Sequence, residues 1–191
     1  MLPAQELANA ISMLFPAIVT LQCALVHKHT LVTALLIGTT MHLPVSFTYH
    51  LLAALKRLPD RIDNDFRRLD QTLQHVACAI FAYATTGIVK YGLACLFLNS
   101  LGIFALWHPR TSNDGRRFIP INLCAHLYMM PMLWRGDTSN FLIAFEAFWM
   151  GGVFFVPFIN YDFFDGWGHF IFHLALGVHS YALAESAVLI V

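Results

Sequence analysis

The sequence predicts an all-α integral membrane protein, a bundle of seven transmembrane helices in which residues 1–191 form a single domain. Two observations predict this fold class. Hydrophobic residues make up 58% of the chain and charged residues only 12%, a balance typical of membrane proteins. Apolar segments also follow one another along the chain, each close to the ~20 residues that a bilayer-spanning helix needs. The formal net charge of zero gives no indication of a nucleic-acid partner.

The expected helices cover, in chain order, residues 7–26, 30–55, 70–89, 91–107, 118–134, 139–158 and 168–190. Each of the first three ends at basic residues, because charged side chains are costly in hydrocarbon. These basic ends are His27-Lys28-His29, Lys56-Arg57 and Lys90. The second helix contains Pro44, and a polar link of residues 58–69 separates it from the third.

The last four expected helices are separated by polar loops and contain residues that interrupt helices. The loop 107–117 is the clearest break in the chain. The fifth helix is short and contains Pro120 and Pro131, and the sixth contains Pro157 near its end. A turn of residues 160–166, rich in Asp and Gly, leads into the seventh helix. These short links leave no room for a soluble domain.

The distribution of Lys and Arg predicts the orientation, since basic residues favour the cytoplasmic side of a membrane. With seven spans, the N-terminus shares one side with the links between helices two and three, four and five, and six and seven. The basic residues of that side are Lys56, Arg57, Arg61, Arg67, Arg68, Arg110, Arg116 and Arg117. The other side holds Lys28, Lys90 and Arg135. We therefore expect a multi-pass protein with a cytoplasmic N-terminus.

A pair of histidines in the last helix is the strongest chemical signal of the chain. His169 and His173 are four residues apart inside an apolar run, so they project from one face of a helix on successive turns. This spacing lets two imidazoles bind one metal ion. In a soluble helix the pair would more often be two packed core histidines, but ionisable residues inside membrane helices tend to be functional.

Candidate partners for this pair stand near the same predicted membrane face. His42, Ser46 and His50 repeat every four residues in the second helix, with His50 next to the link that follows. Asp70 opens the third expected helix, where an acidic residue also suits the helix dipole. Three neutral imidazoles with one open position describe a catalytic zinc site, and a nearby carboxylate supplies a proton acceptor.

The motif positions resemble those of the CREST superfamily of seven-helix membrane proteins. The matching motifs are Ser46-x-x-x-His50 in the second helix, Asp70 opening the third and His169-x-x-x-His173 in the seventh. The superfamily includes alkaline ceramidases, adiponectin and progestin receptors, hemolysin III-like proteins and post-GPI-attachment phospholipases. The run from His169 looks most like the post-GPI-attachment and myomaker branch. The acidic N-terminal calcium-binding segment expected of ceramidases is missing, because Glu6 is the only acid before the first helix.

The resemblance implies a zinc-dependent lipid acyl hydrolase of the phospholipase or ceramidase type. His50, His169 and His173 would hold zinc, Asp70 would orient or deprotonate the bound water, and Ser46 would bond that water or the developing oxyanion. A membrane lipid would be cleaved at an acyl ester or amide. Asp60, Asp63 and Asp65 lie in the same link and are alternative carboxylates. A non-catalytic relative with a structural zinc site, such as a receptor, a fusion factor or a structural subunit, is the alternative function.

The topology can be tested with epitope tags in intact cells. We expect a tag on the N-terminus to be accessible from the cytoplasm and a tag on the C-terminus to be accessible only from the opposite side, because the cytoplasmic links carry most of the basic residues. Selective permeabilisation followed by antibody labelling measures this. Two tags accessible from the same side would contradict an odd number of spans.

Overall fold

The protein is described by a computed structural model, which covers residues 2–58, 64–108, 118–156, 161–162 and 164–190. Its helices are α1 (Pro3–Ser12), α2 (Leu14–His27), α3 (Thr30–Ala54), α4 (Asp65–Ala84), α5 (Val89–Trp107), α6 (Phe118–Trp134), α7 (Thr138–Phe154) and α8 (Gly168–Val188). Two short antiparallel strands, β1 (Phe155–Val156) and β2 (Tyr161–Asp162), and the 3-10 helix Phe164–Gly166 lie between α7 and α8. The strand pair was not predicted, but the all-helical class is confirmed.

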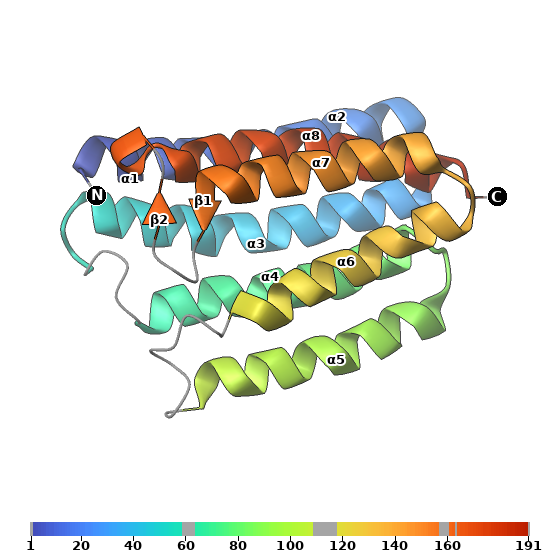
Figure 1. Ribbon diagram of the computed structural model, residues 1–191, viewed down its shortest axis with the longest axis horizontal. Coiled ribbons are helices and arrows are strands. Elements are labelled where there is room, and N and C mark those ends of the chain that lie inside the picture. The colour runs from blue at the N-terminus through green and yellow to red at the C-terminus, as the bar shows by residue number, and fades with distance from the viewer. Residues whose placement is uncertain (1, 59–63, 109–117, 157–160, 163, 191) are drawn as a thin grey trace.

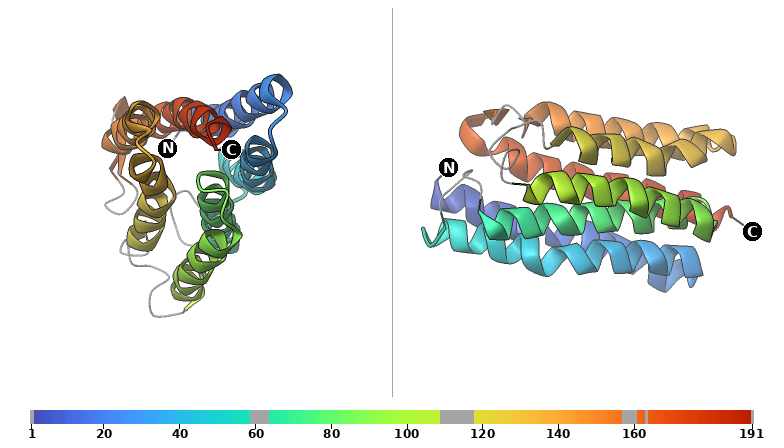
Figure 2. Two further views of the ribbon diagram at one scale, coloured as in Figure 1. Left: turned by 90° about the vertical axis from the view of Figure 1, so that its right-hand side faces the viewer. Right: turned by 90° about the horizontal axis from the view of Figure 1, so that it is seen from below.

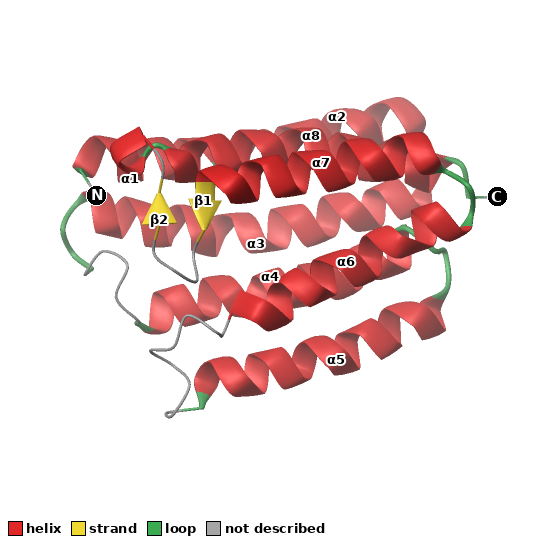
Figure 3. Cartoon of the chain, viewed as in Figure 1, coloured by secondary structure: helices red, strands yellow, loops and turns green. Residues whose placement is uncertain are grey.

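The helices run side by side along one long axis and form a single bundle (Figure 1 and Figure 3). The N-terminus lies at one end and the C-terminus at the other, and α4, α6 and α8 all begin at the end that holds the N-terminus. The end-on view in Figure 2 places α5 at the edge of the bundle, where it packs against α4 and α6. Helix α1 packs against both α3 and α8, a placement that brings it to the candidate site.

Three helical segments of the described chain are long and apolar enough to cross a membrane. They are Pro3–His27, Thr30–Ala54 and Val89–Trp107. The first combines α1 and α2, which meet at Met13, and it begins four residues before the expected helix 7–26. Pro44 lies inside α3 without ending it. The remaining expected spans correspond to helices α4, α6, α7 and α8.

Helix α4 begins earlier than predicted, so the expectation that Asp70 opens this helix is wrong. The helix starts at Asp65, and Asn64 caps it by accepting a hydrogen bond from the backbone N–H of Arg67 at 3.0 Å. Its first turns carry charged residues, and a search for apolar segments therefore begins the helix too late. Asp70 instead lies in the second turn, and the helix ends at Ala84, before Gly87 with its positive φ of 69°.

The packing of α7 against α8 fixes the position of the helix that carries His169 and His173. Gly151 of α7 faces α8 so closely that a Cβ there would lie 2.8 Å from Phe172 Cδ2 and 3.0 Å from Ala175 Cβ. A Cβ at the adjacent Gly152 would meet no atom of the described residues within 4 Å. Only the first glycine is therefore required by the packing of the two helices.

This pair of glycines gives a matched test of the helix packing. We expect Gly151→Ala to lower stability relative to Gly152→Ala by about 1–3 kcal/mol, because overpacking forces neighbours to move. Both substitutions gain the same helix propensity, on the order of 1 kcal/mol for Gly to Ala. Thermal unfolding of both variants in the same detergent measures the difference. Equal unfolding temperatures would contradict the close contact between α7 and α8.

Candidate metal centre

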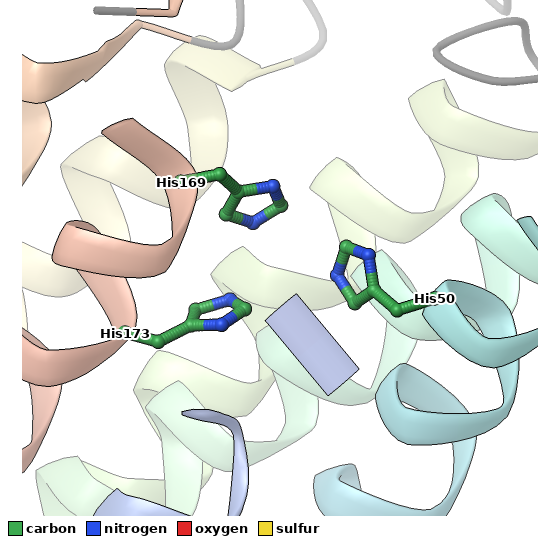
Figure 4. A group of neighbouring side chains, drawn as sticks. All are labelled: His50, His169 and His173. Carbon is green, nitrogen blue, oxygen red and sulfur yellow. The ribbon is translucent and has the colours of Figure 1, made fainter. Parts of the chain in front are cut away.

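Three histidines from two helices meet in the half of the bundle that contains the N-terminus. His50 comes from α3, and His169 and His173 come from the first two turns of α8. Figure 4 shows the rings pointing toward one another across the space between these helices. One ring nitrogen of each lies within 4.8 Å of those of the other two. The group can therefore hold a metal ion, since imidazole nitrogens are common metal ligands.

The ring contacts also show how tight the cluster is. The centroid of the His169 ring lies 4.8 Å from that of His50 and 4.5 Å from that of His173. His50 and His173 are 2% and 3% exposed, and His169 is half-buried. Rings this close together can share one cation as neutral ligands.

Helix α1 orients two of these histidines through their Nδ1 atoms. The Glu6 carboxylate lies 2.7 Å from Nδ1 of His50, and both side chains are buried. Nδ1 of His173 lies 3.1 Å from the backbone oxygen of Asn9 and 2.9 Å from the hydroxyl of Ser12. A carboxylate and a carbonyl only accept hydrogen bonds, so Nδ1 carries the proton in both rings. Their Nε2 atoms are thereby left available to bind a metal ion.

The role of α1 was not predicted from the sequence. The predicted site includes neither Asn9 nor Ser12, and it includes Glu6 only as the single acid before the first expected helix, with no role at the cluster. A signal was present: Gln5, Glu6, Asn9 and Ser12 form a polar stripe at helical spacing in an apolar segment. All are buried. A buried polar stripe needs polar partners, so it predicts contact with other buried polar groups.

Asp70 stands beside the histidine cluster without belonging to it. Its Oδ1 lies 2.7 Å from Nε2 of His42, and its Oδ2 accepts a hydrogen bond from Gln74 Nε2 at 3.2 Å. Ser46 is also buried and lines the same cavity as this carboxylate. His42, which shares the four-residue repeat with Ser46 and His50, is thus the partner of Asp70.

The structure distinguishes among the alternative carboxylates of the link. Asp60 and Asp63 lie outside the described residues. Asp65 is exposed at the first position of α4 and does not line the cavity that holds the histidines. Asp70 is buried and lines that cavity. Of the two described acids of this segment, Asp70 is therefore the one that faces the cluster.

One cavity of about 210 Å³ connects all the predicted site residues. Ser46, His50, Asp70, His169 and His173 line it, in the parts of their helices that lie toward the N-terminal end of the bundle. Farther in, the walls become largely apolar; the residues there include Ala77, Phe81, Ala125, Phe148 and Leu176. A polar end with convergent ligands and an apolar remainder is the usual form of a small-molecule site.

Comparisons with protein-family models, with curated proteins and with solved structures gave no significant match for this chain.

The orienting role of Glu6 can be tested by metal affinity. We expect Glu6→Ala to weaken metal binding by about 10- to 100-fold, because the His50 ring loses the acceptor that holds it. Titration of the metal-free protein against a competing chelator measures this affinity.

Glu185→Ala is the matched control for this test. Glu185 also pairs with a histidine, His27, at 3.0 Å, but it lies at the opposite end of α8 from His169. Unchanged affinity in Glu6→Ala, or an equal loss in Glu185→Ala, would contradict the role assigned to α1.

Proposed function

We propose that this chain is a multi-pass membrane hydrolase that uses a zinc ion held by His50, His169 and His173 to cleave an acyl ester or amide of a lipid. One observation carries the proposal: three histidines and a separately held carboxylate, Asp70, line one cavity among apolar helices. A set of ligands without a nearby carboxylate would suit a structural metal equally well. Asp70 adds the group that hydrolysis needs.

The proposal places the site in a seven-span membrane bundle. Helices α1 and α2 form one span, and α3 to α8 form the other six. Large apolar side chains face outward along α5, including Leu93, Phe97 and Phe104, as expected for a lipid-exposed surface. The positions of the termini at opposite ends of the bundle fit an odd number of spans. The count of basic residues then assigns the N-terminus and the histidine cluster to the cytoplasmic side.

The residues at the cluster fit zinc. Imidazole ligands suit zinc, copper, iron and nickel, and three histidines with an open fourth position form the donor set of catalytic zinc sites. The second ring nitrogen of His50 and of His173 is already bonded to an acceptor, as is usual for metal-binding histidines. When bound, zinc would supply a water acidified to a pKa of about 7 and a Lewis acid for the substrate carbonyl.

Asp70 is the proposed general base. His42 and Gln74 each bond one of its two carboxylate oxygens, which fixes the plane of the carboxylate. A carboxylate held in this way can accept a proton from water as the water oxygen bonds to the substrate carbonyl carbon. It can then return that proton to the alcohol or amine that leaves when the C–O or C–N bond breaks. In this proposal the hydroxyl of Ser46, which is buried and lines the same cavity, would donate to the oxyanion that develops on the carbonyl.

The chemistry of the cavity supports a lipid as substrate. Its apolar walls match an acyl chain, while the polar end presents ligands to a carbonyl. The motif resemblance to the CREST superfamily points the same way and favours its phospholipase-like branch. Zinc content without any hydrolysis would instead favour the non-catalytic alternative, in which the same histidines hold a structural ion.

Substitution of two site residues separates metal binding from chemistry. We expect His173→Ala to lose both zinc and activity, because a metal ligand is removed. Asp70→Asn should retain near-stoichiometric zinc at saturating metal but lose about 10²- to 10⁴-fold in hydrolysis rate, because it has no carboxylate to accept a proton. Zinc content and lipid turnover by mass spectrometry are measured on the same samples.

Asp137→Asn provides the control for the same chemical change. Asp137 lies between α6 and α7, where it accepts hydrogen bonds from Asn140 far from the cluster. We expect its zinc content and activity to match the unmodified protein. Full activity of metal-loaded Asp70→Asn would remove Asp70 from the mechanism.

A further inference from the structure

The cavity below the histidine cluster stops at the same level on the helices that surround it. The residues farthest from the cluster that still line it are Gly38 in α3, Phe81 in α4, Tyr128 in α6 and Ser180 in α8. Beyond this level the described interior is filled with side chains. The largest fully buried apolar residues there are Leu35, Met129, Met132 and Leu183. The bundle is therefore hollow toward the cluster and solid toward the C-terminus.

A hydrogen-bonded pair of side chains, Tyr128 and His179, lies where the cavity ends. Tyr128 Oη lies 2.8 Å from His179 Nε2, and His179 Nδ1 lies 2.8 Å from the backbone oxygen of Ala144. Because the Ala144 carbonyl only accepts, His179 donates from Nδ1 and receives the Tyr128 hydroxyl at Nε2. Both side chains are buried. The pair joins α6, α7 and α8, so it is a fixed structure rather than a mobile side chain.

Two phenylalanines complete this closure. The Phe81 ring lies 5.4 Å from the Tyr128 ring and the Phe148 ring 5.8 Å from that of His179, measured between centroids. All four line the cavity. We refer to Phe81, Tyr128, Phe148 and His179 as the floor. Tyr128 and His179 resist displacement because packing and hydrogen bonds both hold them, and the two partly buried phenylalanines pack against their rings.

The distance from the cluster to the floor sets the length of chain that can fit. His179 lies six residues after His173 and ten after His169 in α8, which corresponds to about 9–15 Å at 1.5 Å per residue. An extended chain advances about 1.2 Å per bond, so this depth accommodates roughly 8–12 carbons.

The volume gives a similar limit. An apolar cavity of about 150 Å³ holds one benzene molecule, and this cavity has about 210 Å³. It therefore holds a chain nearer to the lower end of the range set by its depth.

We propose that the floor, and the Tyr128–His179 pair in particular, restricts this site to lipids with acyl chains of medium length. This inference rests on the proposed function, because it takes the ligand of the apolar cavity to be the acyl chain of the substrate. An octanoyl chain fits by both depth and volume, a lauroyl chain reaches the full depth between the cluster and the floor, and a palmitoyl chain exceeds that depth. The floor residues are specificity-determining and do not touch the reacting atoms.

Retention of fatty acids by the purified protein tests this selectivity without requiring hydrolysis. The protein in lipid nanodiscs is incubated with equal amounts of octanoate, laurate and palmitate, washed, and analysed by mass spectrometry, with empty nanodiscs subtracted. We expect the unmodified protein to retain octanoate and laurate in preference to palmitate. Burial normally favours the longer chain by about fourfold per methylene, so a preference for laurate over palmitate requires a physical stop.

Two variants change the depth of the compartment in opposite directions. Tyr128→Ala removes the ring that closes it, and the ratio of retained palmitate to laurate should rise on the order of tenfold, the gain from about two further buried methylenes. Ala125→Phe fills the space one turn closer to the cluster, where Ala125 is buried against the cavity. It should reduce laurate retention at least tenfold relative to octanoate.

Met132→Ala is the control for loss of volume near the floor. Met132 is fully buried and does not line the cavity, so its truncation leaves the floor intact and should not change the ratios. The proposal is overturned if the unmodified protein retains palmitate to the same extent as laurate. It is also overturned if the ratios of retained fatty acids are identical in the unmodified protein and the three variants. If Tyr128→Ala fails to fold, Ala125→Phe alone decides, because unchanged laurate retention in that variant contradicts a closed compartment.

Hydrolysis assays test the limit on acyl-chain length and the hydrolase activity separately. Length-selective retention with no turnover of any lipid would leave the acyl compartment standing and reject the hydrolase. Turnover of esters of octanoate, laurate and palmitate at equal rates would support the hydrolase and reject the floor as a limit on chain length.

Discussion

The contacts that α1 makes with His50 and His173 are the constraint on which the rest of the site depends. A buried carboxylate such as Glu6 is costly unless it is paired and hydrogen-bonded, and its partner here is the His50 ring. The same helix bonds His173 on α8 through the backbone of Asn9 and the hydroxyl of Ser12. The short helix α1 thereby holds His50 of α3 and His173 of α8 near a common point. A cation bound at that point would also balance the negative charge of Glu6.

The interior of the bundle is packed with side chains at one end and contains the cavity at the other. Toward the C-terminus, methionines and leucines fill the space between helices, and such close packing gives the helices a fixed relation to one another. Toward the N-terminus, the same helices surround the cavity, whose polar groups bond one another in pairs such as His42 with Asp70. The solid half supports the hollow half, since a site needs ligands held by rigid elements.

The sequence predicted the parts of this structure that depend on local pattern. Apolar runs located the helices, and the four-residue spacing of His169 and His173 placed both on one face, as the structure does. It failed where long-range packing decides. The start of α4 at Asp65 depends on the Asn64 cap among charged residues, where hydropathy gives no signal. Glu6 meets His50 across 44 positions of the chain, and the Tyr128–His179 pair joins helices whose contact no local pattern indicates.

The central claim is that His50, His169 and His173 bind zinc, and X-ray absorption at the zinc edge tests it most directly. Measured on purified protein loaded with one equivalent of zinc, the spectrum should show nitrogen ligands at about 2.0–2.1 Å with imidazole scattering, together with one oxygen ligand. The four cysteines of the chain are buried, and none of them belongs to the histidine group, so no sulfur contribution is expected. Sulfur ligands at about 2.3 Å, or a spectrum unchanged by His173→Ala, would contradict the account.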